Sequence, residues 1–526
     1  MSRDSEHPET PSSWLAEIHA QPPEREALIF EGEVSSFGEM ADGVARLLAD
    51  FDRNDLSPIL AQGERIALFA PPSAAGVLLI HACLERGVVM VPWNLRWTDE
   101  ECVFAARAAG TKWIVVSEQT EAAGDRIAAS LGCGLLRLVE STGLAATIAL
   151  VRHPAPDPVF DTERASETTR DADREWVLAR RGALLLFTSG TSGRPKAALL
   201  SDRNLRASAR ASIQLLGRDA DDRWLCCMPL FHIGGLSILV RSVLARTCVV
   251  LHRGFDAGAV SQALDHERVT RVSWVATMLS RVLDHRGDRP APDSLRLVLL
   301  GGGPAPDSML ERARRLGYPL APTYGLTEAA SQVATRPPDA AVREGESLAS
   351  GLVALPGTEI RIVDEAGMPL PADSPGAIEV RGPTVMPGYF RDRDATTSAL
   401  RNGWLVTGDV GILDVRGGLQ VLDRRSDLIV SGGENVYPAE VESVLAGYPG
   451  VSEAAVIGAP DPRFGACVRA LVVPEAGAAL EEPALLEFCR ERLAGFKVPR
   501  SIDFVDALPR TASGKLLRRD LANRFR

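Results

Sequence analysis

The run Phe187-Thr-Ser-Gly-Thr-Ser-Gly-Arg-Pro-Lys196 directly follows an apolar stretch that begins at Leu184. Backbone amides at Gly190 and Gly193 can approach an anion closely, and the four hydroxyls of the run can bind phosphate oxygens together with Lys196. The run does not fit the Walker pattern G-x-x-x-x-G-K-[ST]. It therefore predicts a phosphate-binding loop of another kind at the end of a buried strand. The alternative is a generic Gly/Ser turn.

Lysine is rare in this chain, since only four of its 58 Lys and Arg residues are lysines. An ammonium is a compact, rotatable charge and a guanidinium is a planar fork, so a retained lysine is a candidate for a position that arginine cannot fill. Lys196 ends the run above, and Lys515 ends the run Pro509-Arg-Thr-Ala-Ser-Gly-Lys515. Both are predicted to be functional. For Lys497 we favour a solvated loop.

The length and the charge of the chain limit the classes of protein to which it can belong. With 526 residues, 45% of them hydrophobic and 24% charged, it is expected to form a globular protein of two or more domains. The net charge of −11 disfavours nucleic acid and anionic membranes as principal partners. It does not exclude a nucleotide bound in a locally positive pocket.

Targeting signals and cysteine usage indicate the compartment. The longest apolar stretches, such as residues 74–93, are interrupted by charged residues, so no membrane-spanning helix is predicted. The polar N-terminus lacks the basic-then-apolar order of a signal peptide. Eight scattered cysteines show no metal-ligand spacing, and Cys226 and Cys227 lie between apolar residues, as buried thiols do. These features favour a reducing cytoplasm.

Short apolar runs alternate with helical patterns through the first half of the chain. Residues 65–69, 113–116, 184–187 and 295–300 are predicted to be buried strands of an α/β sheet, because each is an apolar run bounded by turn residues or a helical pattern. Further along, residues 376–381 alternate as a half-exposed strand does, and short strands punctuated by glycine follow.

A change of domain is predicted at residues 423–427, which are five polar residues between two apolar runs. After it, Pro438 suits the first turn of a helix, and residues 485–493 place apolar side chains on one helical face. The expected organisation is a large N-terminal α/β domain (1–422), this hinge, and a small, mobile α+β domain (428–526).

Three further runs carry side chains suited to a nucleotide. Thr323-Tyr-Gly-Leu-Thr-Glu328 offers an aromatic face for a base, a hydroxyl for phosphate and a carboxylate for a hard cation such as Mg²⁺. Gly301-Gly-Gly303 follows a predicted strand, where an α/β sheet opens to ligands. Trp404-Leu-Val-Thr-Gly-Asp409 places a carboxylate suited to a ribose diol after a strand. Alone, each run has an ordinary alternative: a solvated glutamate, a strand-to-helix turn and a turn aspartate.

In their order and spacing these elements resemble the acyl-activating, adenylate-forming superfamily of acyl-CoA synthetases, carrier-protein adenylation domains and luciferases. The resemblance rests on the phosphate loop, residues 324–328, Thr407-Gly-Asp409, Asp423-Arg424 and Lys515. It extends from about residue 25 to the end of the chain.

Within the superfamily, three strings are most similar to the ligases that join 2-succinylbenzoate to CoA in menaquinone synthesis. The strings are Met228-Pro-Leu-Phe-His-Ile-Gly-Gly-Leu-Ser-Ile-Leu-Val240, Leu300-Gly-Gly-Gly-Pro-Ala-Pro306 and Leu428-Ile-Val-Ser-Gly-Gly-Glu-Asn-Val-Tyr-Pro438. Related ligases share parts of them, so another aryl or fatty acid stays open as the substrate.

The resemblance implies a two-step ligase that uses ATP, Mg²⁺ and CoA. The carboxylate of the acid attacks the α-phosphate of ATP and pyrophosphate leaves; the thiol of CoA then displaces AMP. Because two anions must meet in the first step, catalysis is chiefly positioning and charge neutralisation. The expected partners are small molecules only: a carboxylic acid, ATP and CoA.

The resemblance also assigns roles to individual residues. Catalytic roles are implied for Thr188, Lys196, Glu328 and Lys515, with Glu328 holding Mg²⁺ and Lys515 reaching the α-phosphate. Nucleotide contacts are implied for Ser189, Gly190, Thr191, Ser192 and Gly193 on the phosphates, Thr327 on the α-phosphate, Tyr324, Gly301, Gly302 and Gly303 at the adenine, and Asp409 and Arg424 at the ribose. After the first step the small domain is expected to rotate, withdrawing Lys515 and bringing Gly432 and Gly433 to the CoA side.

The acid itself is predicted to meet His232, Ser237 and Thr277. A lone histidine in an apolar run is usually a core residue with its hydrogen bonds satisfied. The prediction for His232 therefore rests on the other motifs around it. A second carboxylate on the substrate would need hydrogen-bond donors or an arginine. The candidates, which the sequence does not rank, are Arg203, Arg206, Arg210 and Arg241.

Two rival functions stay open. One is an adenylation enzyme that loads the phosphopantetheine of a carrier protein, although no carrier domain is visible in the chain. The other is a non-catalytic nucleotide- or acyl-binding protein on the same fold, which the intact Lys196, Glu328, Asp409 and Lys515 argue against. An acid-dependent ATP–pyrophosphate exchange assay separates enzyme from binder, since a pure binder shows no exchange.

Overall fold

The computed structural model describes most of the chain between residues 13 and 525. The residues outside its description are 1–12, 54–55, 57–59, 142–143, 153–175, 178–180, 189–194, 304, 341–346, 425–428, 432–433, 437, 462–464, 494, 496, 511–515 and 526. The chain divides into two compact units, and neither is continuous in sequence. The first comprises Met1–Phe255, Thr327–Ser331 and Pro383–Thr397; the second comprises Asp256–Leu326, Gln332–Gly382 and Ser398–Arg526.

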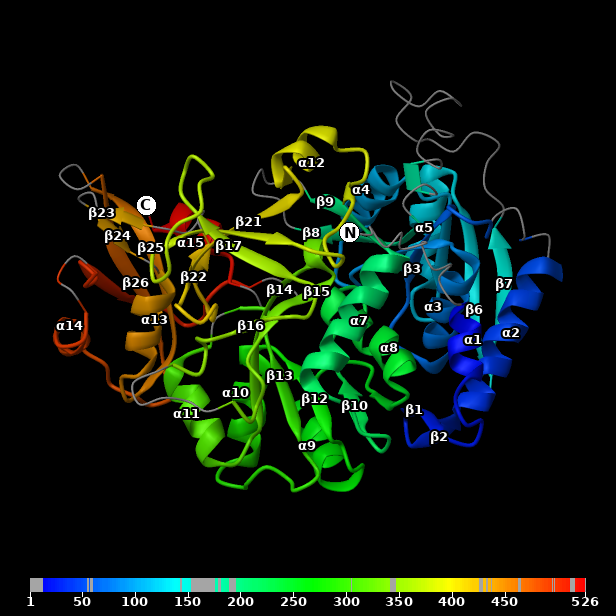
Figure 1. The fold of residues 1–526 in the computed structure, drawn as a ribbon, viewed down its shortest axis with the longest axis horizontal. Coiled ribbons are helices and arrows are strands. Elements are labelled where there is room, and N and C mark those ends of the chain that lie inside the picture. The colour runs from blue at the N-terminus through cyan, green and yellow to red at the C-terminus, as the bar shows by residue number, and fades with distance from the viewer. Residues whose placement is uncertain are drawn as a thin grey trace, which may run out of the picture. The chain divides into compact units, whose positions relative to one another are not determined.

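The first unit is built around a mixed sheet that its described residues form from eight strands (Figure 1). Their order is β19 (Gly388–Tyr389), β9 (Lys196–Ser201), β8 (Gly182–Thr188), β4 (Val89–Pro92), β3 (Arg65–Phe69), β5 (Trp113–Val116), β6 (Gly134–Ser141) and β7 (Ala145–Arg152). β3 pairs in parallel with β4 and β5, whereas β8 and β9 form an antiparallel hairpin. β3 is buried at every position, as parallel strands covered on both faces are.

Two helices pack against this sheet, α4 (Asp99–Ala109) and α5 (Glu121–Leu131). Their apolar side chains share one buried cluster with those of β3, β4, β5 and β8. α4 begins with a capping box, in which the Thr98 hydroxyl accepts from the Glu101 amide and the Glu101 carboxylate accepts from the Thr98 amide. The local sequence therefore fixes where this helix starts.

Four further strands of the first unit pair with one another in the order β10 (Arg223–Cys226), β11 (Cys248–Leu251), β1 (Glu26–Phe30) and β2 (Glu33–Ser36). The helices of this unit also include α1 (Trp14–His19), α2 (Phe37–Arg53), α3 (Ala74–Arg86), α7 (Asp202–Leu216) and α8 (Ile233–Ala245). α7 and α8 lie side by side (Figure 1). The thiols of Cys226 and Cys227 are fully buried, as predicted.

The second unit contains β12 (Arg271–Trp274), β13 (Leu297–Leu300), β14 (Leu320–Leu326), β15 (Ser331–Thr335) and β16 (Val353–Ala354), hydrogen-bonded in that order. Its helices α9 (Ala257–His266), α10 (Ala276–Arg286) and α11 (Asp307–Arg315) alternate with the first of these strands. Another sheet has the order β17 (Glu359–Val363), β18 (Gly376–Arg381), β21 (Trp404–Leu413) and β20 (Leu400–Arg401), with β22 (Leu419–Arg424) beside β21.

The last hundred residues form the α+β fold that the sequence predicts. Their sheet has the order β24 (Glu434–Val436), β23 (Ile429–Ser431), β26 (Gly465–Pro474) and β25 (Val451–Asp461), with β27 (Ser501–Phe504) beside β26. The helices α13 (Pro438–Ala446) and α14 (Glu482–Arg490) share one buried cluster with this sheet, and α15 (Arg518–Arg524) shares another. Pro438 is the first residue of α13, as predicted.

The predicted strands are confirmed with small differences in length. Residues 65–69, 113–116 and 376–381 are strands with the predicted bounds, whereas residues 184–187 lie inside the longer β8. The predicted strand at residues 295–300 begins two residues later, at Leu297. The predicted hinge runs from the end of β22 into residues 425–427, outside the described part of the chain, so the division at 423–427 stays a prediction.

Candidate active site

The two ends of the predicted phosphate loop are held together by the hairpin of β8 and β9. Thr188 is the last residue of β8 and Lys196 the first of β9, and the two are direct partners across the antiparallel pair. Residues 189–194, which include the predicted Ser189, Gly190, Thr191, Ser192 and Gly193, lie outside the described residues.

Glu328 reaches the same place from a distant part of the chain. It lies on the short helix η1 (Thr327–Ala329), and its Oε1 accepts a hydrogen bond of 2.9 Å from the phenol of Tyr389. The Nζ of Lys196 lies 5.4 Å from the centre of the Tyr389 ring, within the range of a cation–π contact. The structure thus brings Lys196 and Glu328, predicted separately, to two sides of one tyrosine.

Tyr389 is a residue of this site that the sequence analysis missed. Burial, followed by the charge and the hydrogen bond of Glu328, raises the pKa of its phenol, while a hydrogen bond with Thr188 lowers it. The net direction is upward, so the phenol stays protonated and can donate. The available signal was an aromatic residue after a glycine, Gly388-Tyr389, and a buried strand residue gives the same signal.

The second unit brings together two other predicted residues. The phenol of Tyr324 donates to Oδ2 of Asp409 at 2.6 Å. Asp409 is 8% exposed, and its amide donates to the hydroxyl of Thr407 at 3.1 Å. The aromatic ring proposed for a base and the carboxylate proposed for a ribose are therefore neighbours. Arg424 pairs with Asp409 through the backbones of β22 and β21.

The predicted Gly301, Gly302 and Gly303 follow β13 directly. A Cβ on Gly301 would lie 2.7 Å from Cγ2 of Thr323, and Gly302 has a φ of +82°, which side chains rarely adopt. Glycine here lets the turn approach the strand that carries Tyr324. The adenine side of the predicted site therefore has a physical reason for its glycines.

The predicted acyl pocket is divided between the units. His232 precedes α8 as its N-cap, and Ser237 lies on the second turn, where its hydroxyl donates to the carbonyl of Gly234. Burial lowers the pKa of His232 to about 4, so its imidazole is neutral at pH 7. Thr277 lies on α10 in the second unit.

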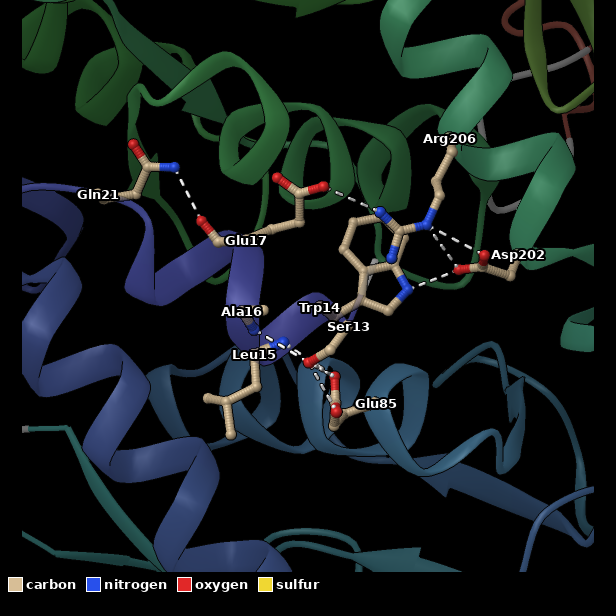
Figure 2. A network of polar contacts seen from close by, with 9 residues as sticks. All are labelled: Ser13, Trp14, Leu15, Ala16, Glu17, Gln21, Glu85, Asp202 and Arg206. Atoms are coloured by element: carbon tan, nitrogen blue, oxygen red, sulfur yellow. Dashed lines mark hydrogen bonds and ion pairs between the residues drawn. The ribbon is translucent and has the colours of Figure 1, made fainter. Parts of the chain in front are cut away.

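The structure separates the four candidate arginines. Arg206 is 5% exposed; its guanidinium forms ion pairs with Asp202 at 3.0 Å and with Glu17 at 3.4 Å, and lies 3.8 Å from the ring of Trp14. Figure 2 shows this network, in which the charge of Arg206 is already compensated. Arg206 is therefore no longer a candidate partner for a second carboxylate of the substrate.

Arg241 differs from the other candidates in sharing a face of α8 with Ser237. Its Nη2 donates to the Ser237 hydroxyl at 3.4 Å, and its guanidinium lies 4.5 Å from the ring of Trp224. Arg203 and Arg210 are exposed on α7. Arg241, which is 2% exposed, is thus the candidate connected to a predicted acyl-pocket residue.

Several predicted residues lie outside the part of the chain that the structure describes. They are the loop residues 189–193, the predicted CoA-side glycines Gly432 and Gly433, residues 425–427 of the predicted hinge and Lys515. Their predicted roles rest on the sequence alone.

The acidic groups suit a metal ion that arrives with a nucleotide. Among the described residues, no group of three or more His, Cys, Asp or Glu side chains could hold an ion. Mg²⁺ in nucleotide-using enzymes takes one or two carboxylates, with phosphate oxygens and waters as its other ligands. Glu328 is partly exposed and carries the phenol of Tyr389 on one oxygen, so it can supply one such carboxylate.

None of the described helices combines the length and the apolarity needed to cross a bilayer.

Curated proteins of similar length match nearly the whole chain. The 2-succinylbenzoate–CoA ligase of Listeria monocytogenes is 36% identical, covering 98% of this chain and 99% of the relative. The protein of the same name from Bacillus velezensis is 38% identical, covering 97% of each.

Solved structures are similar over the same length. The o-succinylbenzoate CoA synthetase (MenE) from Bacillus subtilis, in complex with the acyl-adenylate intermediate OSB-AMP, has a TM-score of 0.81 at 35% identity, covering 97% of this chain and 98% of that chain. Its complex with ATP and magnesium ion has a TM-score of 0.80. ATP-bound MatB from Rhodopseudomonas palustris has a TM-score of 0.83 at 28% identity, covering 98% of each chain.

Two family models divide the chain between them. The model of the AMP-binding enzyme matches residues 15–390, and the model of the AMP-binding enzyme C-terminal domain matches residues 440–515. Together with the full-length relatives, these matches show that the chain belongs to the family of AMP-binding enzymes.

Proposed function

We propose that this enzyme is an ATP-dependent acid–CoA ligase that converts 2-succinylbenzoate into its CoA thioester through an acyl-adenylate, as a step of menaquinone synthesis. The observation that carries the proposal is the full-length similarity to ligases of this name, at 36–38% identity. The fold alone does not select the acid, because MatB matches it equally well at 28% identity. The acid is therefore argued from sequence identity and the reaction type from the site.

The first half-reaction needs positive charge beside two anions. We propose that Lys196, with the hydroxyls of the phosphate loop, holds the β- and γ-phosphates of ATP, and that Glu328 holds the Mg²⁺ that neutralises part of their charge. Thr327, next to Glu328, is proposed to contact the α-phosphate. The geometry that supports this assignment is the common contact of Lys196 and Glu328 with Tyr389.

The nucleoside end of ATP is assigned to the second unit. We propose that Asp409, with Arg424, accepts the ribose hydroxyls, and that Tyr324 and the turn at residues 301–303 line the adenine pocket. The hydrogen bond from Tyr324 to Asp409 supports the assignment, because it fixes the carboxylate beside an aromatic ring. A carboxylate held in this way does not have to be ordered when the ribose binds.

The charge between the attacking carboxylate and the α-phosphate is assigned to Lys515. An ammonium places one compact charge between two oxygens, which a planar guanidinium does less well. In the second half-reaction the thiol of CoA attacks the acyl carbon and AMP leaves, and residues 432–433 are proposed to face CoA. The proposed compartment is the cytoplasm, where the eight cysteines, all free in the structure, would stay reduced.

The test is acid-dependent ATP–pyrophosphate exchange, followed by thioester formation with free CoA. We expect 2-succinylbenzoate to support exchange, and 4-oxo-4-phenylbutanoate, which lacks only the ring carboxylate, to support it at least about 10-fold less well, since it cannot form the ion pair for which Arg241 is the candidate partner. Equal exchange with both acids would overturn the proposed substrate. Exchange without thioester formation from CoA, but with transfer to a phosphopantetheine carrier, would favour the carrier-loading alternative.

A further inference from the structure

Tyr389 lies where it does because of a strand from late in the chain. β19 adds to the edge of the eight-stranded sheet beside β9, with Tyr389 opposite Ala198, and the amide of Phe390 donates to the carbonyl of Ala197 at 2.8 Å. Gly388 has a φ of +149°, and a Cβ there would lie 2.7 Å from Cγ2 of Thr396. The backbone is therefore fixed on both sides of the tyrosine.

Besides its hydrogen bond with Thr188, the tyrosine side chain makes two contacts with different chemistry. Its hydroxyl has one proton, which it donates to Oε1 of Glu328, and its ring face lies beside the ammonium of Lys196. A carboxylate with one oxygen held in this way cannot rotate freely about its last torsion. An ammonium over an aromatic face likewise loses part of its freedom.

We propose that Tyr389 is a positioning residue of the nucleotide site. Its phenol orients the carboxylate of Glu328 and its ring orients Lys196, so that the group assigned to Mg²⁺ and the group assigned to the phosphates are held at a fixed separation. The inference rests on the proposed function of these two residues and goes beyond it by assigning a role to a third.

The backbone around the site is held from behind by one helix, α7. The Nδ2 of Asn204 donates to the carbonyls of Pro383 and Val385, both at 2.8 Å, and the hydroxyl of Ser208 donates to the carbonyl of Ala330 at 2.6 Å. α7 therefore anchors both of the short, later segments of the first unit, Thr327–Ser331 and Pro383–Thr397. In addition, the amide of Met386 donates to the carbonyl of Glu328 at 2.8 Å.

α7 is in turn fixed by the N-terminal helix. Figure 2 shows Trp14 donating from Nε1 to Asp202 at 2.6 Å, with Arg206 over its ring. The ion pair of Arg206 with Glu17 adds a second link between α1 and α7. Because the scaffold is fixed independently of Tyr389, a change in the tyrosine side chain should alter the site without unfolding the unit.

The first variant, Tyr389→Phe, removes the hydroxyl and keeps the ring. Binding of ATP is measured by calorimetry with Mg²⁺ and with EDTA. We expect the gain in ATP affinity that Mg²⁺ provides to fall by about 10-fold, because loss of a group that orients a metal ligand costs this much or more. Binding of ATP in EDTA should change less, since Lys196 keeps its aromatic neighbour and the metal-independent part of the site loses only the hydrogen bond between Tyr389 and Thr188.

The second variant, Tyr389→Leu, also removes the ring face. We expect it to weaken ATP binding in EDTA by about 3-fold, the size of an exposed cation–π contact. The matched control is Tyr448→Phe, which removes the same hydroxyl from a tyrosine that follows α13 and packs edge-on against Phe488 of α14. It should reproduce both wild-type affinities, and thermal unfolding of all variants checks that they fold.

An unchanged Mg²⁺-dependent gain in Tyr389→Phe, in a folded protein, overturns the positioning role. A loss of equal size with Mg²⁺ and with EDTA also overturns it, because the effect would then not pass through Glu328. Failure of the proposed function is a separate result: the wild-type enzyme would bind MgATP but show no exchange with any acid. Binding needs no acid, so the two failures are distinguishable.

Discussion

The phenol oxygen of Tyr389 lies 2.9 Å from Oε1 of Glu328, although 61 residues separate them in the sequence. Most of the intervening residues belong to the second unit. The contact therefore forms only because the chain re-enters the first unit twice, at Thr327 and again at Pro383. The same tyrosine touches Lys196, nearly two hundred residues earlier. A site assembled in this way depends on the fold around it.

Lys515→Ala should abolish acid-dependent ATP–pyrophosphate exchange, with a loss of at least about 100-fold, because it removes the ammonium proposed to lie between the attacking carboxylate and the α-phosphate. Thioester formation from supplied acyl-adenylate should be much less affected. The two half-reactions are measured separately. Lys497→Ala, which removes an ammonium paired with Glu440 at 2.7 Å, is the control and should retain both. Equal loss of both half-reactions in Lys515→Ala would count against its assigned role.

Asp409→Asn should raise the KM for ATP by about 10-fold, because hydrogen bonds from ribose hydroxyls to a charged acceptor are replaced by neutral ones. The amide oxygen can still accept from Tyr324, so local packing is retained. The decisive comparison uses 2′,3′-dideoxy-ATP, which wild type and variant should bind equally. If the substitution weakens the binding of ATP and of 2′,3′-dideoxy-ATP by the same factor, Asp409 does not act through the ribose.

His81 should make stability depend on pH. It lies in α3, fully buried, and neither ring nitrogen has a hydrogen-bond partner among the described residues. The residues lining the small cavity beside it include no other acid or base. Burial lowers its pKa to about 4 from an ordinary 6.5, so the unfolded chain binds the proton more tightly than the folded one.

The stability that neutral His81 contributes is therefore fully present above pH 6.5, and is lost as the pH falls to 4. The loss amounts to about 3 kcal/mol across this range. His81→Leu should flatten the fall, as measured by urea unfolding at pH 7 and pH 5. His266→Leu, at an exposed position on α9, is the control. An unaltered pH dependence in His81→Leu would refute the assignment to this residue.

Asn204→Ala should destabilise the first unit by about 2–4 kcal/mol, because two carbonyls lose their donor and the helix cap with Ser201 is weakened. Urea unfolding measures the loss. Gln214→Ala, at an exposed position on the same helix, should change stability by less than about 0.5 kcal/mol. Equal effects of the two substitutions would show that the hydrogen bonds of Asn204 to Pro383 and Val385 do not stabilise the unit.

The sequence predicted most of the fold because buried parallel strands are uninterrupted apolar runs, which is why β3 and β5 have their predicted bounds. The predicted bounds were less accurate where buried side chains continue beyond the end of a helix. Leu493 was expected on the face of a helix with Leu485 and Cys489, yet α14 ends at Arg490, and Leu493 packs on the same cluster from beyond it. Hydrophobic spacing reports burial, and in that segment no Gly or Pro marked the end of the helix.

The candidate site was predictable where chemistry is written in a local run and not where it depends on long-range pairing. Lys196, Glu328 and Asp409 stand in recognisable runs, whereas Tyr389 acquires its partners through the addition of β19 to β9. Likewise, the sequence predicted a nucleotide contact for Tyr324 and another for Asp409, but it did not predict the hydrogen bond between them.

The division of the first unit into three stretches of sequence has a consequence for synthesis. Protein chains emerge from the ribosome N-terminus first and their domains tend to fold as they appear. Here the edge strand β19 is the last piece of the eight-stranded sheet, so that sheet cannot be completed until residue 389 has left the ribosome. Until then the outer edge of β9, with Lys196 at its start, has no strand beside it, and unpaired strand edges make such intermediates prone to aggregation.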